Sequence, residues 1–126
     1  MFSINDDKSI FLTRGDIAVI EISASGLGGE PYIFQIGDIV RFRIIEKSQC
    51  SNIVLQKDVR VEEEEASFVD ISLGRNDTKI GELINKPKDY WYEVELNPDT
   101  TPQTIVGYDA NGPKIFRLFP EGDDKQ

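Results

Sequence analysis

The sequence of 126 residues contains no histidine and only one cysteine, one methionine and one tryptophan. Histidine is the side chain whose unperturbed pKa lies nearest to neutral pH, so catalytic triads, most general bases and most zinc sites use it. Its absence excludes Ser-His-Asp and Cys-His mechanisms. The single Cys50 cannot form a disulfide within the chain, which suits a reducing compartment. We interpret it as a small filler or loop residue rather than a catalytic thiol.

Basic residues are also scarce, with 14 Lys and Arg against 23 Asp and Glu and a net charge of −9. Nucleic-acid binding needs clusters of Lys and Arg, and none is visible, so nucleic acid is not an expected partner. No segment approaches the roughly 20 apolar residues that a membrane helix requires. The first residues lack the regions of a signal peptide. We therefore expect a protein that folds inside a cell and makes no membrane contact.

Apolar and polar residues alternate along several short segments, which is typical of strands with one face on a core and the other toward water. Clusters of Gly, Pro, Asn and Asp separate these segments and predict turns. The expected strands are residues 9–13, 17–23, 39–46, 53–61, 66–73, 90–96, 103–108 and 114–118, and residues 32–36 are expected to form a short extended segment.

Two of these segments indicate which side chains face the core. In 39–46 the alternation places Phe42 in the middle of the buried face. In 90–96 the even-numbered residues share one face, and Trp91, Glu93 and Glu95 share the other. If the even-numbered face is the buried one, Trp91 points outward between carboxylates, where tryptophan is enriched at contact hot spots. The alternative, that this strand is buried on both faces and Trp91 belongs to the core, stays open.

Two further local signals concern connections. Asn76-Asp77-Thr78 offers helix-capping groups ahead of residues 79–84, whose apolar spacing predicts a two-turn helix over one end of the sheets. Asn111-Gly112, between the last two expected strands, predicts a β-hairpin.

Together, about eight short strands, one short helix and regularly spaced turns predict an all-β fold, an antiparallel immunoglobulin-like two-sheet sandwich. A partly closed barrel is the alternative. We expect a flexible leader at residues 1–8, a single domain at 9–120 and a charged tail at 121–126.

Three short motifs resemble binding sites, but each has a simpler structural explanation. Arg14-Gly15-Asp16 matches an integrin motif, yet Gly and Asp are common turn residues. The glycine-rich segment 24–31 lacks the spacing and the Lys-Ser/Thr of a phosphate-binding loop. Four consecutive carboxylates at 62–65 lack the alternating ligands and glycine bend of an EF-hand. We therefore predict no catalytic residue, no metal site and no cofactor.

The order of several motifs resembles that of a known family. The motifs are Leu12–Asp16, Gly26–Pro31, Gly37–Phe42 and Tyr92–Leu96, with a short helical turn before the last. In this order they are similar to the small β-sandwich modules of phage and prophage tails and baseplates in Gram-positive bacteria, in particular the N-terminal domain of the baseplate upper protein. The resemblance covers about residues 9–96, and Gly107–Pro120 departs from it.

The resemblance implies a structural or assembly module without catalytic activity. Its partners would be other phage structural proteins or further copies of itself, as an oligomer. It would lie in the bacterial cytoplasm during assembly and in the virion tail if packaged. Trp91 is the residue expected to contact a partner.

Two other functions remain as alternatives. A carbohydrate- or cell-surface-binding sandwich would stack Trp91 or Tyr108 on a sugar ring, but clustered aromatic residues with interleaved Asn and Asp are absent. A glycosidase would need two carboxylates about 5–10 Å apart. Among 23 acidic residues some pair will meet that distance by chance, so the sequence does not support catalysis.

Overall fold

Strand β7 (Lys88–Leu96) is the centre of the larger sheet. The computed structural model describes residues 9–25, 30–47, 52–80, 86–100, 102–107 and 114–120, together with the backbone of residues 2–4. Along one edge, β7 pairs with β4 (Ile39–Ile45). Along the other edge it pairs first with β9 (Lys114–Phe119) and then with β8 (Gln103–Val106).

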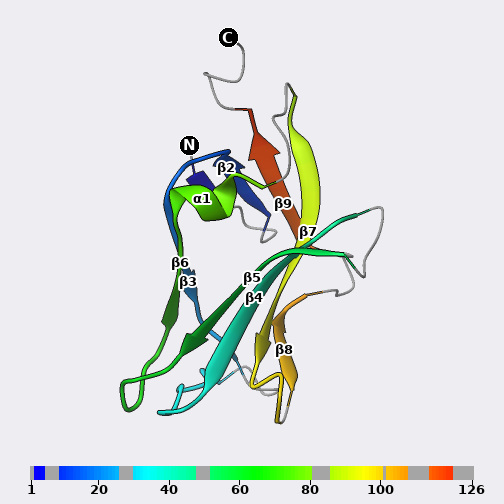
Figure 1. Cartoon of the computed structure of the whole chain (residues 1–126). Helices are drawn as coiled ribbons and strands as arrows, with labels where there is room; N and C mark the ends of the chain where they lie inside the picture. Colours follow the sequence, from blue (N-terminus) through cyan, green and yellow to red (C-terminus); the bar gives the residue numbers. More distant parts are fainter. Residues whose placement is uncertain are drawn as a thin grey trace.

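The remaining strands extend this sheet on both sides and form a second, smaller one. Beyond β4 lies β5 (Ile53–Arg60), and beyond β9 lie β2 (Ile10–Thr13) and β1 (Phe2–Ile4). The resulting seven-stranded sheet curls into a half-barrel, as Figure 1 shows. β3 (Ala18–Ile22) and β6 (Val69–Leu73) form a separate antiparallel pair. The all-β class is confirmed.

The strand directions correct one part of the sequence-based expectation. The seven-stranded sheet is mixed rather than wholly antiparallel, because β2 runs parallel to β9 over four residue pairs, from Ile10↔Phe116 to Thr13↔Phe119. Parallel pairing of two strands so far apart in the sequence depends on the whole topology, which local alternation does not reveal.

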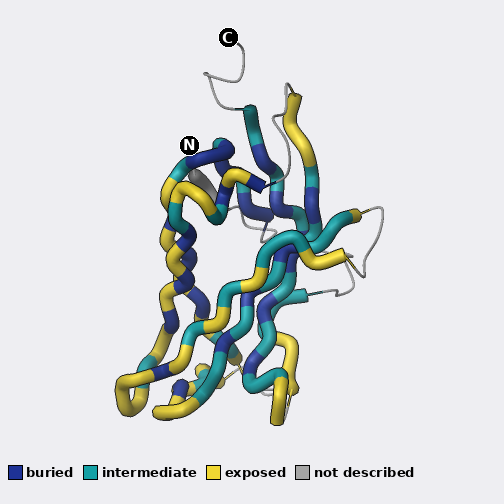
Figure 2. The backbone as a smooth tube through the Cα atoms, in the orientation of Figure 1, coloured by how far each residue is buried: buried dark blue, intermediate teal, exposed yellow. Residues whose placement is uncertain are grey.

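The core lies between the inner faces of the two sheets. Every second residue of β4 is buried, and so is every second residue of β3 and β6 (Figure 2). Phe42 is 0% exposed and contacts two further rings, with centroids 5.6 Å from Tyr92 and 6.5 Å from Phe116. The alternation in the sequence therefore identified the buried face of β4.

Two other segments differ from expectation. Within the expected leader at residues 1–8, the backbone of Phe2–Ile4 forms β1 and pairs with β2, because the outer edge of β2 would otherwise remain unpaired. The expected extended segment at 32–36 makes only an isolated bridge, Phe34↔Ala66, since the turn at Gly37 follows directly. The expected tail at 121–126 lies outside the described residues.

The helix lies earlier in the chain than the capping pattern suggested. α1 is a single turn at Arg75–Thr78, and Lys79 and Ile80 are already non-helical, while residues 81–85 are outside the described part. The Asp77 carboxylate accepts a hydrogen bond of 2.8 Å from the Gly74 backbone N–H. Asp77 therefore closes the first turn from inside the helix instead of preceding it.

The turn expected at Asn111-Gly112 lies outside the described residues, but the strands on either side of it are described. Among these residues β8 and β9 do not pair with each other as a hairpin would require; both pair with the same edge of β7, β9 along residues 88–92 and β8 along 94–96. The long strand β7 offers room for two partners in succession, so the last two strands follow one another along it rather than lie side by side.

A substitution of the central core residue tests this arrangement. Phe42→Ala should lower the free energy of unfolding by about 3–5 kcal/mol, because it leaves a cavity between the two layers. This is a large fraction of the typical stability of about 5–15 kcal/mol. Urea denaturation followed by tryptophan fluorescence measures the change. Phe68→Ala, at a residue that is 46% exposed, serves as the control, and an equal loss in both variants would contradict the proposed core.

Candidate functional site

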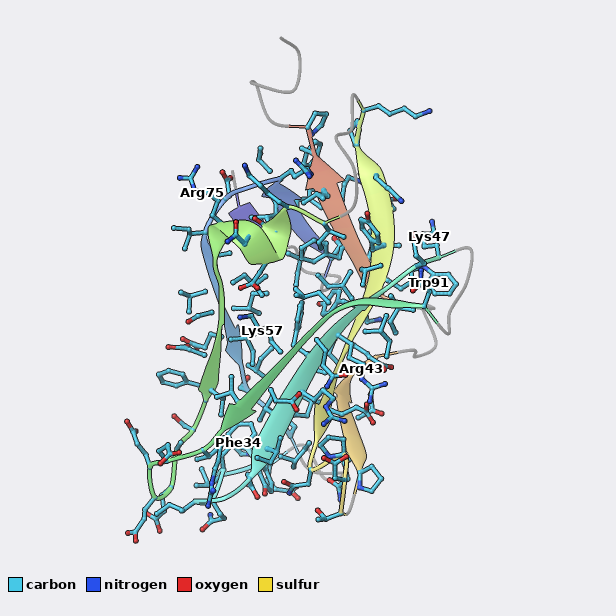
Figure 3. All side chains as sticks on the ribbon, in the orientation of Figure 1. Phe34, Arg43, Lys47, Lys57, Arg75 and Trp91 are labelled. Atoms are coloured by element: carbon cyan, nitrogen blue, oxygen red, sulfur yellow. The ribbon has the colours of Figure 1, made fainter. Side chains whose placement is uncertain are left out.

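Trp91 lies on the outer face of the seven-stranded sheet, on the side away from β3 and β6 (Figure 3). Its neighbours in β7, Tyr90 and Tyr92, are buried in the core, as expected if the even-numbered residues face inward. Directly opposite Trp91 are Ile45 on β4 and Ile115 on β9. Residues opposite one another in adjacent strands share a face. The three half-buried side chains therefore form an apolar row across three strands, which we call the Trp91 row.

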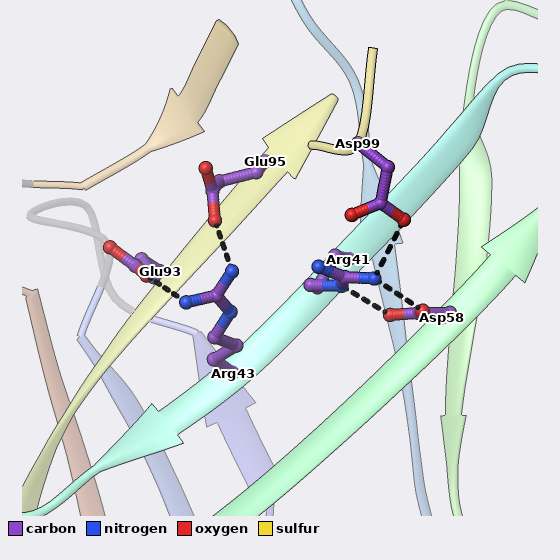
Figure 4. Close-up of polar contacts among 6 residues, drawn as sticks. All are labelled: Arg41, Arg43, Asp58, Glu93, Glu95 and Asp99. Carbon is purple, nitrogen blue, oxygen red and sulfur yellow. Dashed lines mark hydrogen bonds and ion pairs between the residues drawn. The ribbon is translucent and has the colours of Figure 1, made fainter. Parts of the chain in front are cut away.

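Two arginines of β4, Arg41 and Arg43, lie on the same face as Trp91, opposite the part of β7 that follows it (Figure 4). Arg43 lies between Glu93 and Glu95, with N–O distances of 3.6 and 2.9 Å. The carboxylates that were expected to flank Trp91 are thus paired with a cation of the neighbouring strand. Arg43 lies directly opposite Glu93, and Arg41 lies directly opposite Glu95. Opposite charges in such cross-strand pairs stabilise the pairing of β4 with β7.

Arg41 binds two carboxylates at once. Its Nε and Nη2 donate to the two carboxylate oxygens of Asp58 at 2.9 and 3.0 Å, and Nη2 also lies 3.3 Å from Asp99. The hydrogen bonds with Asp58 raise the pKa of the Arg41 guanidinium above its ordinary value. A bidentate geometry holds both side chains in one orientation.

A third arginine lies on the other side of the Trp91 row. Arg117 of β9 donates to Asp89 of β7 at 2.6 and 3.0 Å. Its guanidinium also lies 4.9 Å from the ring centroid of Phe11, which in turn packs edge-on against Phe119 at 5.9 Å. The outer face thus consists of one apolar row between two sets of ordered ion pairs.

Among the described residues, three carboxyl groups have a clearly shifted pKa, and in each the pKa is lowered, which favours the ionised form. The hydrogen bond from Arg117 lowers the pKa of Asp89. Burial acts to raise the pKa of Asp38, but hydrogen bonds from the Gln35 backbone and from Asn97 and Tyr32 outweigh it, so the pKa falls. For Asp77, burial is likewise outweighed by Lys57 and the Gly74 N–H, and its pKa is lowered. These groups serve as hydrogen-bond acceptors at neutral pH.

The Arg-Gly-Asp sequence has a structural role. Arg14 is 7% exposed, and Gly15 takes a φ of 90°, a conformation that favours glycine. The Gly15 N–H donates to Thr78 Oγ1 at 3.0 Å, and that hydroxyl donates to the Asp16 carbonyl at 2.8 Å. The turn therefore joins β2 to the helix, and its arginine is not presented to solvent.

The acidic stretch at 62–65 is an exposed turn, and the described residues include no group of three His, Cys, Asp or Glu side chains arranged so that it could hold a metal ion. Cys50 and Tyr108 lie outside the described part of the chain. Sequence reasoning singled out Trp91 but left its face open, and it did not find the partners Ile45 and Ile115. Only the register of β4 and β9 against β7 brings them together, and no local pattern encodes that register.

No protein-family model, curated protein or solved structure matches this chain. The described residues include no helix of the length and apolar character needed to cross a membrane.

The Asp89–Arg117 pair gives a testable dependence on pH. Because the pKa of Asp89 is lowered on folding, its ionised form contributes stability above the ordinary carboxyl value of about 3.9, and this contribution is lost as the pH falls through the folded-state value. Asp89→Asn should therefore be less stable than the wild type at pH 7, by up to about 1 kcal/mol for a partly exposed pair.

Urea denaturation at neutral pH and in acid checks this expectation. The difference between Asp89→Asn and the wild type should shrink once the pH lies well below about 3.9. Glu63→Gln, in the exposed acidic turn, is the control and should show little difference at either pH. A destabilisation by Asp89→Asn that is the same at both pH values would show that the ion pair is not its source.

Proposed function

We propose that this chain is a non-catalytic structural or assembly module of a phage or prophage tail or baseplate, and that it acts through protein–protein contacts. The observation that carries the proposal is the Trp91 row, which places a half-buried tryptophan between two isoleucines on the outer face of the large sheet. The assignment to a tail or baseplate rests on the sequence resemblance.

The chemistry of this face suits a protein partner. Tryptophan and arginine are enriched among the residues that carry most of the binding energy at interfaces. Arg41, Arg43 and Arg117 flank the row, and each is already fixed by carboxylates of the same face. Side chains held in place before binding lose less conformational freedom when a partner docks.

None of the three carboxylates whose pKa is clearly shifted is a candidate general acid. A carboxyl group that acts as a general acid needs a raised pKa, which burial in an apolar site provides. Asp38, Asp77 and Asp89 instead have lowered pKa values, because each accepts hydrogen bonds in its ionised form.

We further propose that the two sheets correspond to the layers of an immunoglobulin-like sandwich with one layer reduced to β3 and β6. In support, the inner faces of both sheets contribute to one continuous apolar core.

Incorporation into particles tests the function. Particles purified by density gradient from the source strain should contain the chain, detected by mass spectrometry, if it is a tail or baseplate component. Trp91→Ala should reduce incorporation strongly, because truncating a tryptophan hot spot costs about 2 kcal/mol or more of binding energy. Val19→Ala, at an exposed apolar residue of β3 on a different surface, is the control.

Thermal unfolding of both variants confirms that they remain folded. Absence of the wild-type chain from the particles would refute the assignment to a virion. Equal incorporation of both variants would show that the Trp91 row is not the contact. A saturable change in tryptophan fluorescence on adding cell-wall polysaccharide would favour the carbohydrate-binding alternative.

A further inference from the structure

The core is incompletely covered at one edge of the seven-stranded sheet. On β4, Val40 and Ile44 are fully buried. Directly opposite them on β5 lie Val59 and Leu55, which also pack against the core but are only half-buried. Within the described part of the chain, β5 pairs with β4 alone, so its other edge has no strand beside it. The described residues therefore cover the apolar side chains on the inner face of β5 only in part.

A second open edge faces this one. Within the same described residues, β6 pairs only with β3, and β5 and β6 diverge from the turn at 62–66 (Figure 1). The opening between them is a cleft of about 530 Å³ whose lining includes Val59, Val61 and Val69. Phe68, 46% exposed, stands at its margin.

Two contacts made by the protein itself fix the elements around the opening. Near the middle of β5, Lys57 forms an ion pair of 2.9 Å with Asp77 of α1, and Lys57 is labelled in Figure 3. At the turn, backbone hydrogen bonds of 2.8 and 3.1 Å join Phe34 and Ala66. An occupant would therefore enter a site that exists before it binds.

The charged side chains around the cleft indicate what kind of segment would bind there. Four carboxylates and one guanidinium line it, from Glu62, Glu63, Glu65, Asp70 and Arg60. A second copy of this chain, with a net charge of −9, would meet repulsion here. A segment that carries Lys or Arg would be attracted.

We propose that the β5 edge and this cleft bind an extended, basic segment of a partner protein by strand addition. The segment pairs its backbone with β5, directs apolar side chains toward Leu55 and Val59, and directs Lys or Arg toward Glu62 and Glu63. Backbone hydrogen bonds supply the affinity in this mode of recognition, and the alternating side chains supply the specificity. The inference goes beyond the function proposed above, because it does not use the Trp91 row.

A synthetic peptide tests the proposal directly. The probe has eight residues, the length of β5, with alternating lysine and valine and a fluorescent label. Fluorescence anisotropy should show saturable binding, and the backbone amides of Ile53–Arg60 should exchange with solvent more slowly in the complex. A peptide with the same side chains, N-methylated throughout its backbone, should bind at least about tenfold more weakly, because it cannot donate hydrogen bonds to the edge.

Two matched variants separate the charge of the cleft from the charge of the whole protein. Glu62→Gln with Glu63→Gln should weaken binding of the unmethylated peptide about three- to tenfold. Gln103→Lys with Thr104→Lys makes the same change in net charge on β8 and should leave binding within about twofold. Trp91→Ala should also leave it unchanged, so this test can fail or succeed independently of incorporation into particles.

Three results would overturn the proposal. Equal binding of the methylated and unmethylated peptides would mean charge attraction alone. No slowing of exchange in Ile53–Arg60 would mean that the edge is not the site. A dimer in light scattering that protects Ile53–Arg60 without peptide would identify a second copy as the occupant.

Discussion

Apolar contact between the inner faces of the two sheets is the constraint on which the rest of the structure depends. Phe42 and Ile71 are both fully buried within it, one on each sheet. Because side chains alternate along a strand, a shift of one residue in β4 would move its whole apolar set to the solvent side. The register that buries Phe42 therefore also fixes Arg41 and Arg43 on the outer face. The outer surface is a direct consequence of how the core is filled.

The sequence predicts features that depend on neighbouring residues better than features that depend on residues far apart in the chain. The alternation in β4 is local, and it correctly indicated the buried side of Phe42. For β7 the alternation left two interpretations of Trp91 open, and only the structure places this half-buried side chain on the outer face. The row formed with Ile45 and Ile115 is not local, because it requires β4 and β9 to meet β7 in one particular register. The opposed edges of β5 and β6 are likewise visible only once the strands are placed.

Tertiary contacts explain where the helix lies and which strand β8 and β9 pair with. Asn76-Asp77-Thr78 is a sound turn-forming sequence, but its use depends on contacts with other elements. Asp77 acts within the helix because it also meets Lys57 of β5. β8 and β9 each pair with the long central strand β7, and Asn111-Gly112 lies outside the described residues.

The parallel pair of β2 and β9 has a consequence for how the chain reaches its native state. It joins residue 10 to residue 116, so the ladder forms only after nearly every intervening segment exists. Closing so long a loop costs conformational entropy before the contacts of the ladder can offset it. We therefore expect slow folding, on the millisecond-to-second scale typical of domains rich in contacts between distant residues. During translation β2 has only β1 as a sheet neighbour, and the large sheet is completed only after β9 leaves the ribosome.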